Sequence, residues 1–172
     1  MSGHVAMRQV TVERLFEENR DRLGLAWLAD RQGGNRTLTA EASLKPTVGL
    51  VGHMNFIHPF RIQLLGAAEA AYLRGLPEDE LKRSVDRLFT TDLAAIVVAN
   101  GEDIPSHLED GCARHHVALF VSAQPSPHIV DVFRLYLARV LAESTTLHGV
   151  FRDVLEMVVV FTGASEISNS EL

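Results

Sequence analysis

The chain has 172 residues with an apolar content of 47%, which is enough for one globular domain with a real core. Its 16 basic and 22 acidic residues give a net charge of −6 without long runs of one sign, which argues against a nucleic-acid partner. The single cysteine, Cys112, excludes an intramolecular disulfide and a cysteine-based zinc cage. A buried thiol on a helix, in a reducing compartment, is its expected role.

The first residues lack the apolar core of a signal peptide, since Arg8, Glu13 and Arg14 fall close together. No apolar run approaches the about 18 residues of a membrane span. We therefore expect a cytoplasmic protein without a membrane partner.

The first third of the chain contains one amphipathic helix and several short apolar runs. Thr11 is a suitable cap for a helix with Glu13 in its first turn and an apolar face of Val12, Leu15, Phe16 and Leu23. The runs at 25–28, 47–52 and 62–66 predict strands. The polar residues 30–35 predict a loop, and 53–61, which mix His, Asn, Phe and Pro, predict an irregular loop.

The middle of the chain alternates helices with buried strands. Residues 67–73 predict a helix, and Pro77 with the acids after it predicts the start of another. Strands are predicted at 94–99, closed by Asn100-Gly101, and at 117–121. Residues 106–109 have the pattern of a capping box, and Ser126-Pro127 of a helix start. The last helix carries its apolar stripe at Ile129, Phe133, Leu137, Val140 and Leu141.

This alternation from residue 47 onward predicts an α/β fold with a mostly parallel sheet flanked by helices. The rhythm changes after Ser144, where 147–154 and 156–162 read as two adjacent strands. We therefore place a domain boundary near 142–146, with an α/β domain at 1–143 and a short β segment at 144–172 that begins a second domain.

Several polar residues are candidates for ligands. His53 and His58, with Asn55 between them, lie on one loop, but a metal site would need a third ligand from elsewhere, so a turn held by side-chain-to-main-chain hydrogen bonds is the favoured reading. Arg61 could bind an anion or pair with a nearby acid. His115 and His116 fall at a helix end, where the negative end of the dipole favours them.

The last stretch has the frame of a phosphate-binding loop, G-x-x-x-x-G-K-S/T, after an apolar run at 157–161. Gly163 and Ser170 occupy the outer positions of this frame. The residues between them are Ala164, Ser165, Glu166, Ile167, Ser168 and Asn169.

Two substitutions weaken this frame. Ser168 replaces the second glycine and adds a Cβ where main-chain N–H groups must wrap closely around phosphate. Asn169 replaces the lysine whose ammonium balances the charge of the β- and γ-phosphates, and a neutral amide cannot do so. With no acidic Mg²⁺ ligand and no helix after Ser170 in these 172 residues, we do not expect phosphoryl transfer by this chain.

The sequence resembles the bacterial HPr kinase/phosphorylase family, which acts on a seryl residue of the sugar-phosphotransferase carrier HPr. Residues 51–59 and 61–66, with Glu69, Tyr72 and Leu73, are similar to the family's N-terminal domain, as are residues 97–101. Residues 145–154 resemble the start of its kinase domain, and 162–172 overlie its P-loop. The order and spacing of these segments make the resemblance specific.

The resemblance implies an N-terminal domain similar in fold to the substrate domains of muramyl-peptide ligases. It places His148 on an active-site histidine, residues 163–170 on the ATP-binding loop, and Ser170 on the Mg²⁺ ligand of an intact domain. Without the resemblance, His148 reads as a half-buried histidine beside Gly149. The resemblance also implies ATP, Mg²⁺ and HPr as ligands and partner, and a homohexamer to which the kinase domain contributes much.

Two functions remain open at this point. In the first, the chain is the regulatory N-terminal portion of an HPr serine kinase/phosphorylase and is itself catalytically incompetent, with His148 a spectator. In the second, it is a stand-alone α/β ligand-sensing or oligomerisation module that binds a small anion at the carboxyl ends of its strands, with the 53–61 loop as a rim. Residual nucleotide binding without turnover is a third, less attractive reading.

Overall fold

Three short apolar strands form the centre of the fold. Strands β5 (Ile62–Leu65), β6 (Ala95–Val98) and β7 (Ala118–Val121) run parallel, with Leu64 opposite Val97 and Val97 opposite Phe120. The edge strands β4 (Phe56–Ile57) and β2 (Ala26–Trp27) pair antiparallel with β5 and β7, giving the order β2-β7-β6-β5-β4. The prediction of an α/β fold with a mostly parallel sheet is confirmed.

The structure is a computed structural model that describes residues 9–28, 31–39, 56–57 and 61–142. The predicted strand at 47–52, the boundary at 142–146 and the segment 144–172 lie outside these ranges. Of the predicted 53–61 loop, residues 56–57 form strand β4 instead, because they pair with Ile62 and Gln63. Among the described helices, none is long and apolar enough to cross a membrane.

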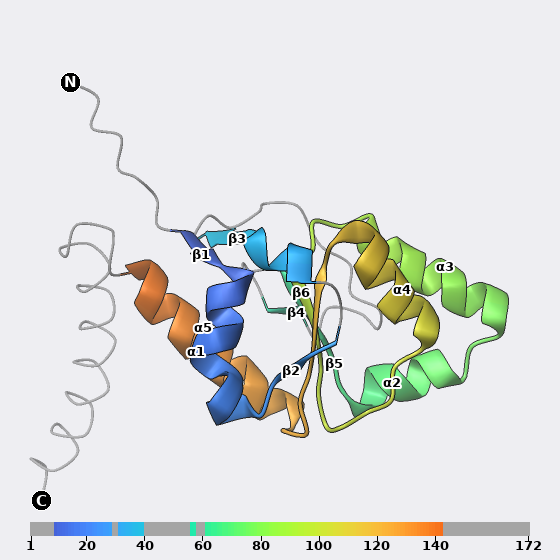
Figure 1. The fold of residues 1–172 in the computed structure, drawn as a ribbon. Helices are drawn as coiled ribbons and strands as arrows, with labels where there is room; N and C mark the ends of the chain where they lie inside the picture. The colour runs from blue at the N-terminus through green and yellow to red at the C-terminus, as the bar shows by residue number, and fades with distance from the viewer. Residues whose placement is uncertain (1–8, 29–30, 40–55, 58–60, 143–172) are drawn as a thin grey trace, which may run out of the picture.

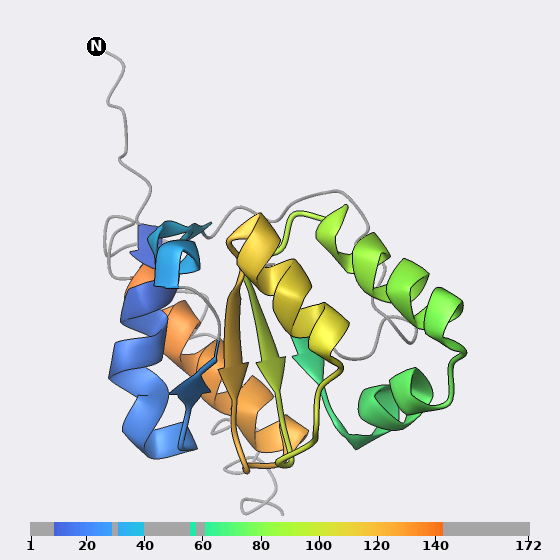
Figure 2. The same ribbon diagram turned by 45° about the vertical axis from the view of Figure 1, so that its right-hand side comes forward.

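Two groups of helices cover the two faces of the sheet, as Figures 1 and 2 show. Helices α1 (Val12–Leu23) and α5 (Ser126–Ala142) share one core cluster with Leu64, Val97 and Phe120. Helices α2 (Ala67–Arg74), α3 (Glu78–Phe89) and α4 (Ser106–His115) share a second cluster, to which the sheet contributes the alternate residues Leu65, Val98 and Leu119. Burial of both faces explains why these strands read as unbroken apolar runs.

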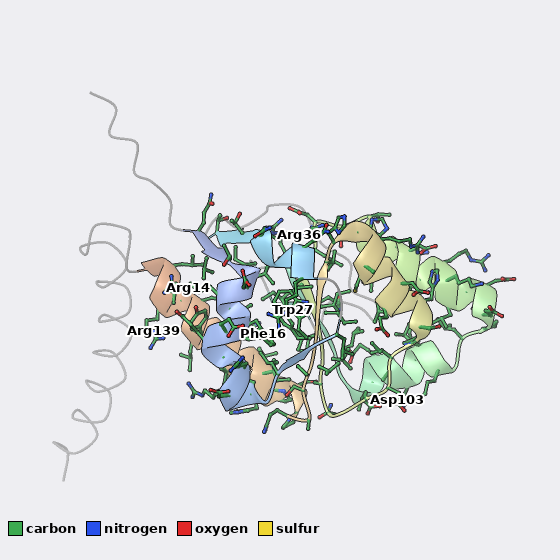
Figure 3. The ribbon with its side chains drawn as sticks, in the orientation of Figure 1. Arg14, Phe16, Trp27, Arg36, Asp103 and Arg139 are labelled. Atoms are coloured by element: carbon green, nitrogen blue, oxygen red, sulfur yellow. The ribbon has the colours of Figure 1, made fainter. Side chains whose placement is uncertain are left out.

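The helices flanking the first face follow their sequence patterns closely. The Thr11 side chain accepts a hydrogen bond from the main-chain N–H of Arg14, so the predicted cap of α1 is confirmed. The α5 stripe is core as predicted, since Ile129, Phe133 and Leu137 are fully buried. The edge strand is anchored by Trp27, whose ring lies 5.1 Å from Phe16 and 4.9 Å from Phe120 between ring centroids. Figure 3 labels Phe16 and Trp27 in this cluster.

Three elements near the N-terminus differ from the prediction. Strands β1 (Gln9–Thr11) and β3 (Thr37–Thr39) form an antiparallel ribbon that the sequence pattern did not reveal, because three residues are too few to establish a period. The predicted polar loop at 30–35 is the 3₁₀-helix η1 (Arg31–Asn35) over residues 31–35. Its Gly33 is buried against the start of β7, where a Cβ would lie 2.6 Å from the main-chain nitrogen of Ala118.

Two predicted helix starts are shifted by one residue. The capping box at 106–109 is wrong, because Ser106 is already inside α4, Pro105 is the cap, and no side chain caps the helix. The predicted Ser126 cap fails in the same way. The main-chain carbonyl of Pro125 accepts from the N–H of His128 at 3.1 Å, and within the described residues the buried Ser126 hydroxyl has no hydrogen-bond partner. In both helices a proline occupies the position before the first helical residue, where the sequence pattern predicted serine.

We predict that Gly33→Ala destabilises the fold by about 2 kcal/mol, because the added methyl group would collide with the main chain of β7. Gly75→Ala is the matched control, since its Cβ would meet nothing closer than 3.6 Å. Urea unfolding of both variants measures the difference. Equal midpoints for the two variants would show that η1 does not pack as described.

A second prediction concerns Glu18 and Tyr136, which join α1 to α5. The hydrogen bond from the Tyr136 hydroxyl, and then that from Arg14, hold the pKa of Glu18 below its ordinary value. A carboxyl with a lowered folded-state pKa stabilises the fold above its unfolded pKa, and this contribution is lost as the pH falls through the folded value. Tyr136→Phe should therefore destabilise the protein at neutral pH and matter less in acid.

The Glu18 side chain is 41% exposed, and solvent screening weakens its interactions. We therefore expect Tyr136→Phe to lower the free energy of unfolding at neutral pH by only about 1 kcal/mol. Urea unfolding at neutral pH, and again below the titration range of carboxyl groups, measures it. Tyr72→Phe on α2, with a tyrosine that is 42% exposed, is the control. A loss of equal size at both pH values would contradict the assignment.

Candidate functional site

The carboxyl edge of the parallel strands is where ligands bind in open α/β sheets, and in the described part of this chain two helix starts meet there. Gly66 follows β5 and begins α2, and its N–H donates to the buried Glu69 carboxylate at 2.8 Å. A Cβ on Gly66 would lie 2.4 Å from the Ser126 hydroxyl oxygen, so the starts of α2 and α5 touch. The Glu69 side chain therefore occupies the N-terminal end of α2.

The rest of the carboxyl edge is held by main-chain hydrogen bonds. The Asn100 and Gly101 N–H groups, just after β6, donate to the carbonyls of Gln124 and Ser122 at 2.9 and 3.0 Å. The Ser122 hydroxyl, 3% exposed at the residue level, donates to the Leu23 carbonyl at 2.5 Å. These contacts join the turns after β6 and β7 to the end of α1.

The opposite, amino edge is organised by Arg36, a residue that the sequence pattern did not single out. Its guanidinium donates to the carbonyls of Leu93, His115 and His116 at 2.6, 2.7 and 3.0 Å. These carbonyls belong to the entry of β6 and the end of α4, whose orphan carbonyls a cation satisfies well. Figure 3 labels Arg36 at this edge. Its partners are 57 to 80 residues away in the sequence, so no local sequence pattern predicts the contact.

Arg61 belongs to the same edge. It directly precedes β5, with a φ of 58°, and its side chain pairs with Asp92 and donates to the Thr37 carbonyl at 2.8 Å. Of the two readings of Arg61, pairing with a nearby acid is confirmed. Arg61 itself stands at the amino end of β5, away from the carboxyl ends of the strands, and apart from residues 56–57 the rest of the 53–61 loop is outside the described residues. His53, Asn55 and His58 lie outside the described residues.

Helices α3 and α4 meet at a small group of polar side chains around Asp86 of α3. His107 Nε2 lies 2.9 Å from Asp86 Oδ1, and Arg114 approaches the same oxygen at 3.9 Å. His107 and Arg114 line an open hollow with Asp110 and Ala113. Within the described ranges, no group of three His, Cys, Asp or Glu residues is placed to hold a metal ion.

Cys112 and His115 have structural roles in helix α4. Burial, with a smaller contribution from Glu109, raises the pKa of the Cys112 thiol to about 12, so this thiol is not a nucleophile at neutral pH. The expectation of a buried thiol on a helix is confirmed. His115 ends α4 as predicted, and its ring stacks on Phe89 with centroids 4.7 Å apart.

The residues that the sequence predicts to carry out chemistry are elsewhere in the chain. His148, the loop 163–170 and Ser170 all fall outside the described residues. What the structure does place is the α/β body that precedes them.

Comparison with known proteins identifies this body. Residues 10–137 match the family described as HPr Serine kinase N terminus. The chain belongs to the HPr kinase/phosphorylase family. The matched range runs from strand β1 to helix α5, and it ends before His148.

Relatives with the printed name HPr kinase/phosphorylase extend the match. The protein of Chromobacterium violaceum is 46% identical over 166 residues, which cover 96% of this chain and 52% of the relative. That of Neisseria meningitidis serogroup B is 42% identical with the same coverage. That of Ralstonia nicotianae is 40% identical over 165 residues, which cover 95% of this chain and 51% of the relative. The chain thus spans about half the length of the curated relatives it matches.

We predict that Arg36→Ala destabilises this N-terminal body of the HPr kinase/phosphorylase family by about 2 to 3 kcal/mol, because three carbonyls lose a charged donor. Arg36→Lys should fall between the variant and the wild type, since a lysine cannot reproduce the guanidinium fork. Arg22→Ala, at an exposed site on α1, is the control. Urea unfolding decides. An effect of Arg36→Ala no larger than the control would remove Arg36 from this role.

Proposed function

We propose that this chain is the N-terminal portion of an HPr serine kinase/phosphorylase, the enzyme that phosphorylates and dephosphorylates a seryl residue of HPr. The observation that carries the proposal is the family match over residues 10–137, together with the 46% identity to the Chromobacterium violaceum relative. The resemblance of residues 145–172 to the start of the kinase domain supports the same placement.

In the intact enzyme, ATP with Mg²⁺ supplies the phosphoryl group, and the seryl hydroxyl of HPr attacks in line, with an aspartate as base. The phosphorylase direction is a phosphorolysis: inorganic phosphate accepts the phosphoryl group, pyrophosphate forms and the seryl hydroxyl is restored. Residues 163–170 are the part of this chain proposed to face the phosphates, with Ser170 toward the Mg²⁺ and His148 beside the loop.

We further propose that residues 1–172 alone do not transfer phosphate. The carboxamide of Asn169 can donate a hydrogen bond, but it carries no positive charge to offset a polyphosphate. Ser168 adds a Cβ where the loop pattern has glycine and main-chain N–H groups must approach the phosphates. The catalytic aspartate and the acidic metal ligand would have to come from outside these 172 residues.

The described α/β domain is consistent with a regulatory role rather than a catalytic one. Its thiol is buried, Glu69 and Ser126 lie against Gly66 at its carboxyl edge, and its two amino-edge arginines are engaged with the protein itself. None of these named groups is positioned to act on a ligand as an acid, a base or a nucleophile.

The direct test is phosphorylation of purified HPr by the purified 172-residue chain with ATP and Mg²⁺. The intact Chromobacterium violaceum relative, assayed in parallel, is the positive control. We expect no transfer by the chain, as followed by the mass of HPr. Transfer at a rate near that of the intact relative would overturn the proposed incompetence.

A companion variant separates the loop from the missing groups. Asn169→Lys combined with Ser168→Gly restores the loop pattern, and we expect it to remain inactive. In an intact family member with a lysine at the position of Asn169, replacing that lysine with asparagine should abolish transfer. Rescue of the 172-residue chain by the double variant would mean that the loop alone had limited it.

A further inference from the structure

A tight turn follows the central strand β6. Asn100 and Gly101 both have left-handed φ values, 59° and 64°, and the Glu102 N–H donates to the Ala99 carbonyl at 3.2 Å. Two successive left-handed residues in a four-residue turn are the type I′ arrangement that an Asn-Gly pair favours. Both residues are exposed.

We propose that Asn100 is a site of spontaneous deamidation whose rate is set by the opening of this turn. The main-chain nitrogen of Gly101 attacks the side-chain carbonyl carbon of Asn100, because glycine has no side chain to obstruct the approach. A nitrogen–carbon bond forms, the Gly101 proton is lost, the side-chain carbon–nitrogen bond breaks and ammonia leaves. Water then opens the cyclic imide, leaving aspartate or isoaspartate.

In the folded turn, hydrogen bonds keep the Gly101 nitrogen from attacking the Asn100 side chain. The Gly101 N–H donates to the Ser122 carbonyl at 3.0 Å, and the Asn100 N–H donates to the Gln124 carbonyl at 2.9 Å. Ser122 is itself fixed, since its hydroxyl donates to the Leu23 carbonyl at 2.5 Å and accepts from the Gln124 N–H at 3.0 Å. The reaction therefore requires a local opening that separates the turn after β6 from the turn after β7.

The modification would change the edge on which it occurs. It adds a carboxylate beside Glu102 and Asp103, the second of which Figure 3 labels just beyond the turn. Isoaspartate also lengthens the main chain by a carbon, so the hydrogen bonds to Ser122 and Gln124 could not all be kept. The turn would then hold β6 and β7 together less firmly.

The experiment compares the native chain, the urea-unfolded chain and Ser122→Ala in mildly alkaline buffer, with deamidation at Asn100 followed by peptide mapping and mass spectrometry. We expect the unfolded chain to react fastest. Ser122→Ala should react roughly 30-fold faster than the native chain, the rise in open population that the loss of the two hydrogen bonds of the Ser122 hydroxyl predicts. Ser84→Ala on α3 is the matched control, and Asn35, which precedes Arg36 rather than glycine, is the internal control.

Equal rates in the native and unfolded chains would overturn the gating, as would Ser122→Ala reacting no faster than Ser84→Ala. An Asn100 that stays intact in the unfolded chain would remove the site altogether. Should Ser122→Ala fail to fold, the wild-type rate in urea below the unfolding midpoint replaces it: gating requires a rate that rises with urea, and a flat profile refutes it.

Discussion

The burial of both faces of three four-residue strands is the constraint on which the rest of the fold depends. Strands this short gain little from pairing alone, so they need apolar cover on each side. Alternate residues of β6 divide the work, with Val97 facing α1 and α5 and Val98 facing the α2–α4 layer. Each helix layer thus supports the other through the sheet, whose outer strands in the described part of the chain have two residues each.

The two ends of the sheet are held by different contacts. At the amino edge, Arg36 and Arg61 bind main-chain carbonyls and Asp92, so positive charge there is used for cohesion. At the carboxyl edge, Gly66 has no side chain, so the starts of α2 and α5 can touch. The Glu69 carboxylate accepts the Gly66 N–H at the positive end of the α2 dipole. The polar groups named at both ends of the sheet thus make contacts within the α/β domain itself. This agrees with the proposal that the catalytic residues lie outside this domain.

Much of this architecture could be predicted from the sequence, because apolar runs and helical stripes are local signals. Strands β5 to β7, the helices of both layers, the Thr11 cap and the core role of Phe133 and Leu137 all followed from such patterns. The ribbon of β1 and β3 did not, since its strands are too short to show a period. Arg36 could not be found because its partners are distant in sequence, and Pro105 and Pro125 shifted the helix starts that serine was expected to mark. Of the candidate site, only Arg61 and the carboxyl edge fall within the described residues, and there the simpler reading of Arg61 prevailed.

The seclusion of the lone thiol has a practical consequence. Cys112 lies wholly inside the α2–α4 layer and is not reactive at neutral pH. A cysteine introduced at an exposed position, such as Leu135 on α5, would therefore be the sole attachment point for a fluorophore or spin label. Distances from such probes to an added kinase domain or to HPr could be measured without first engineering away a native sulfur.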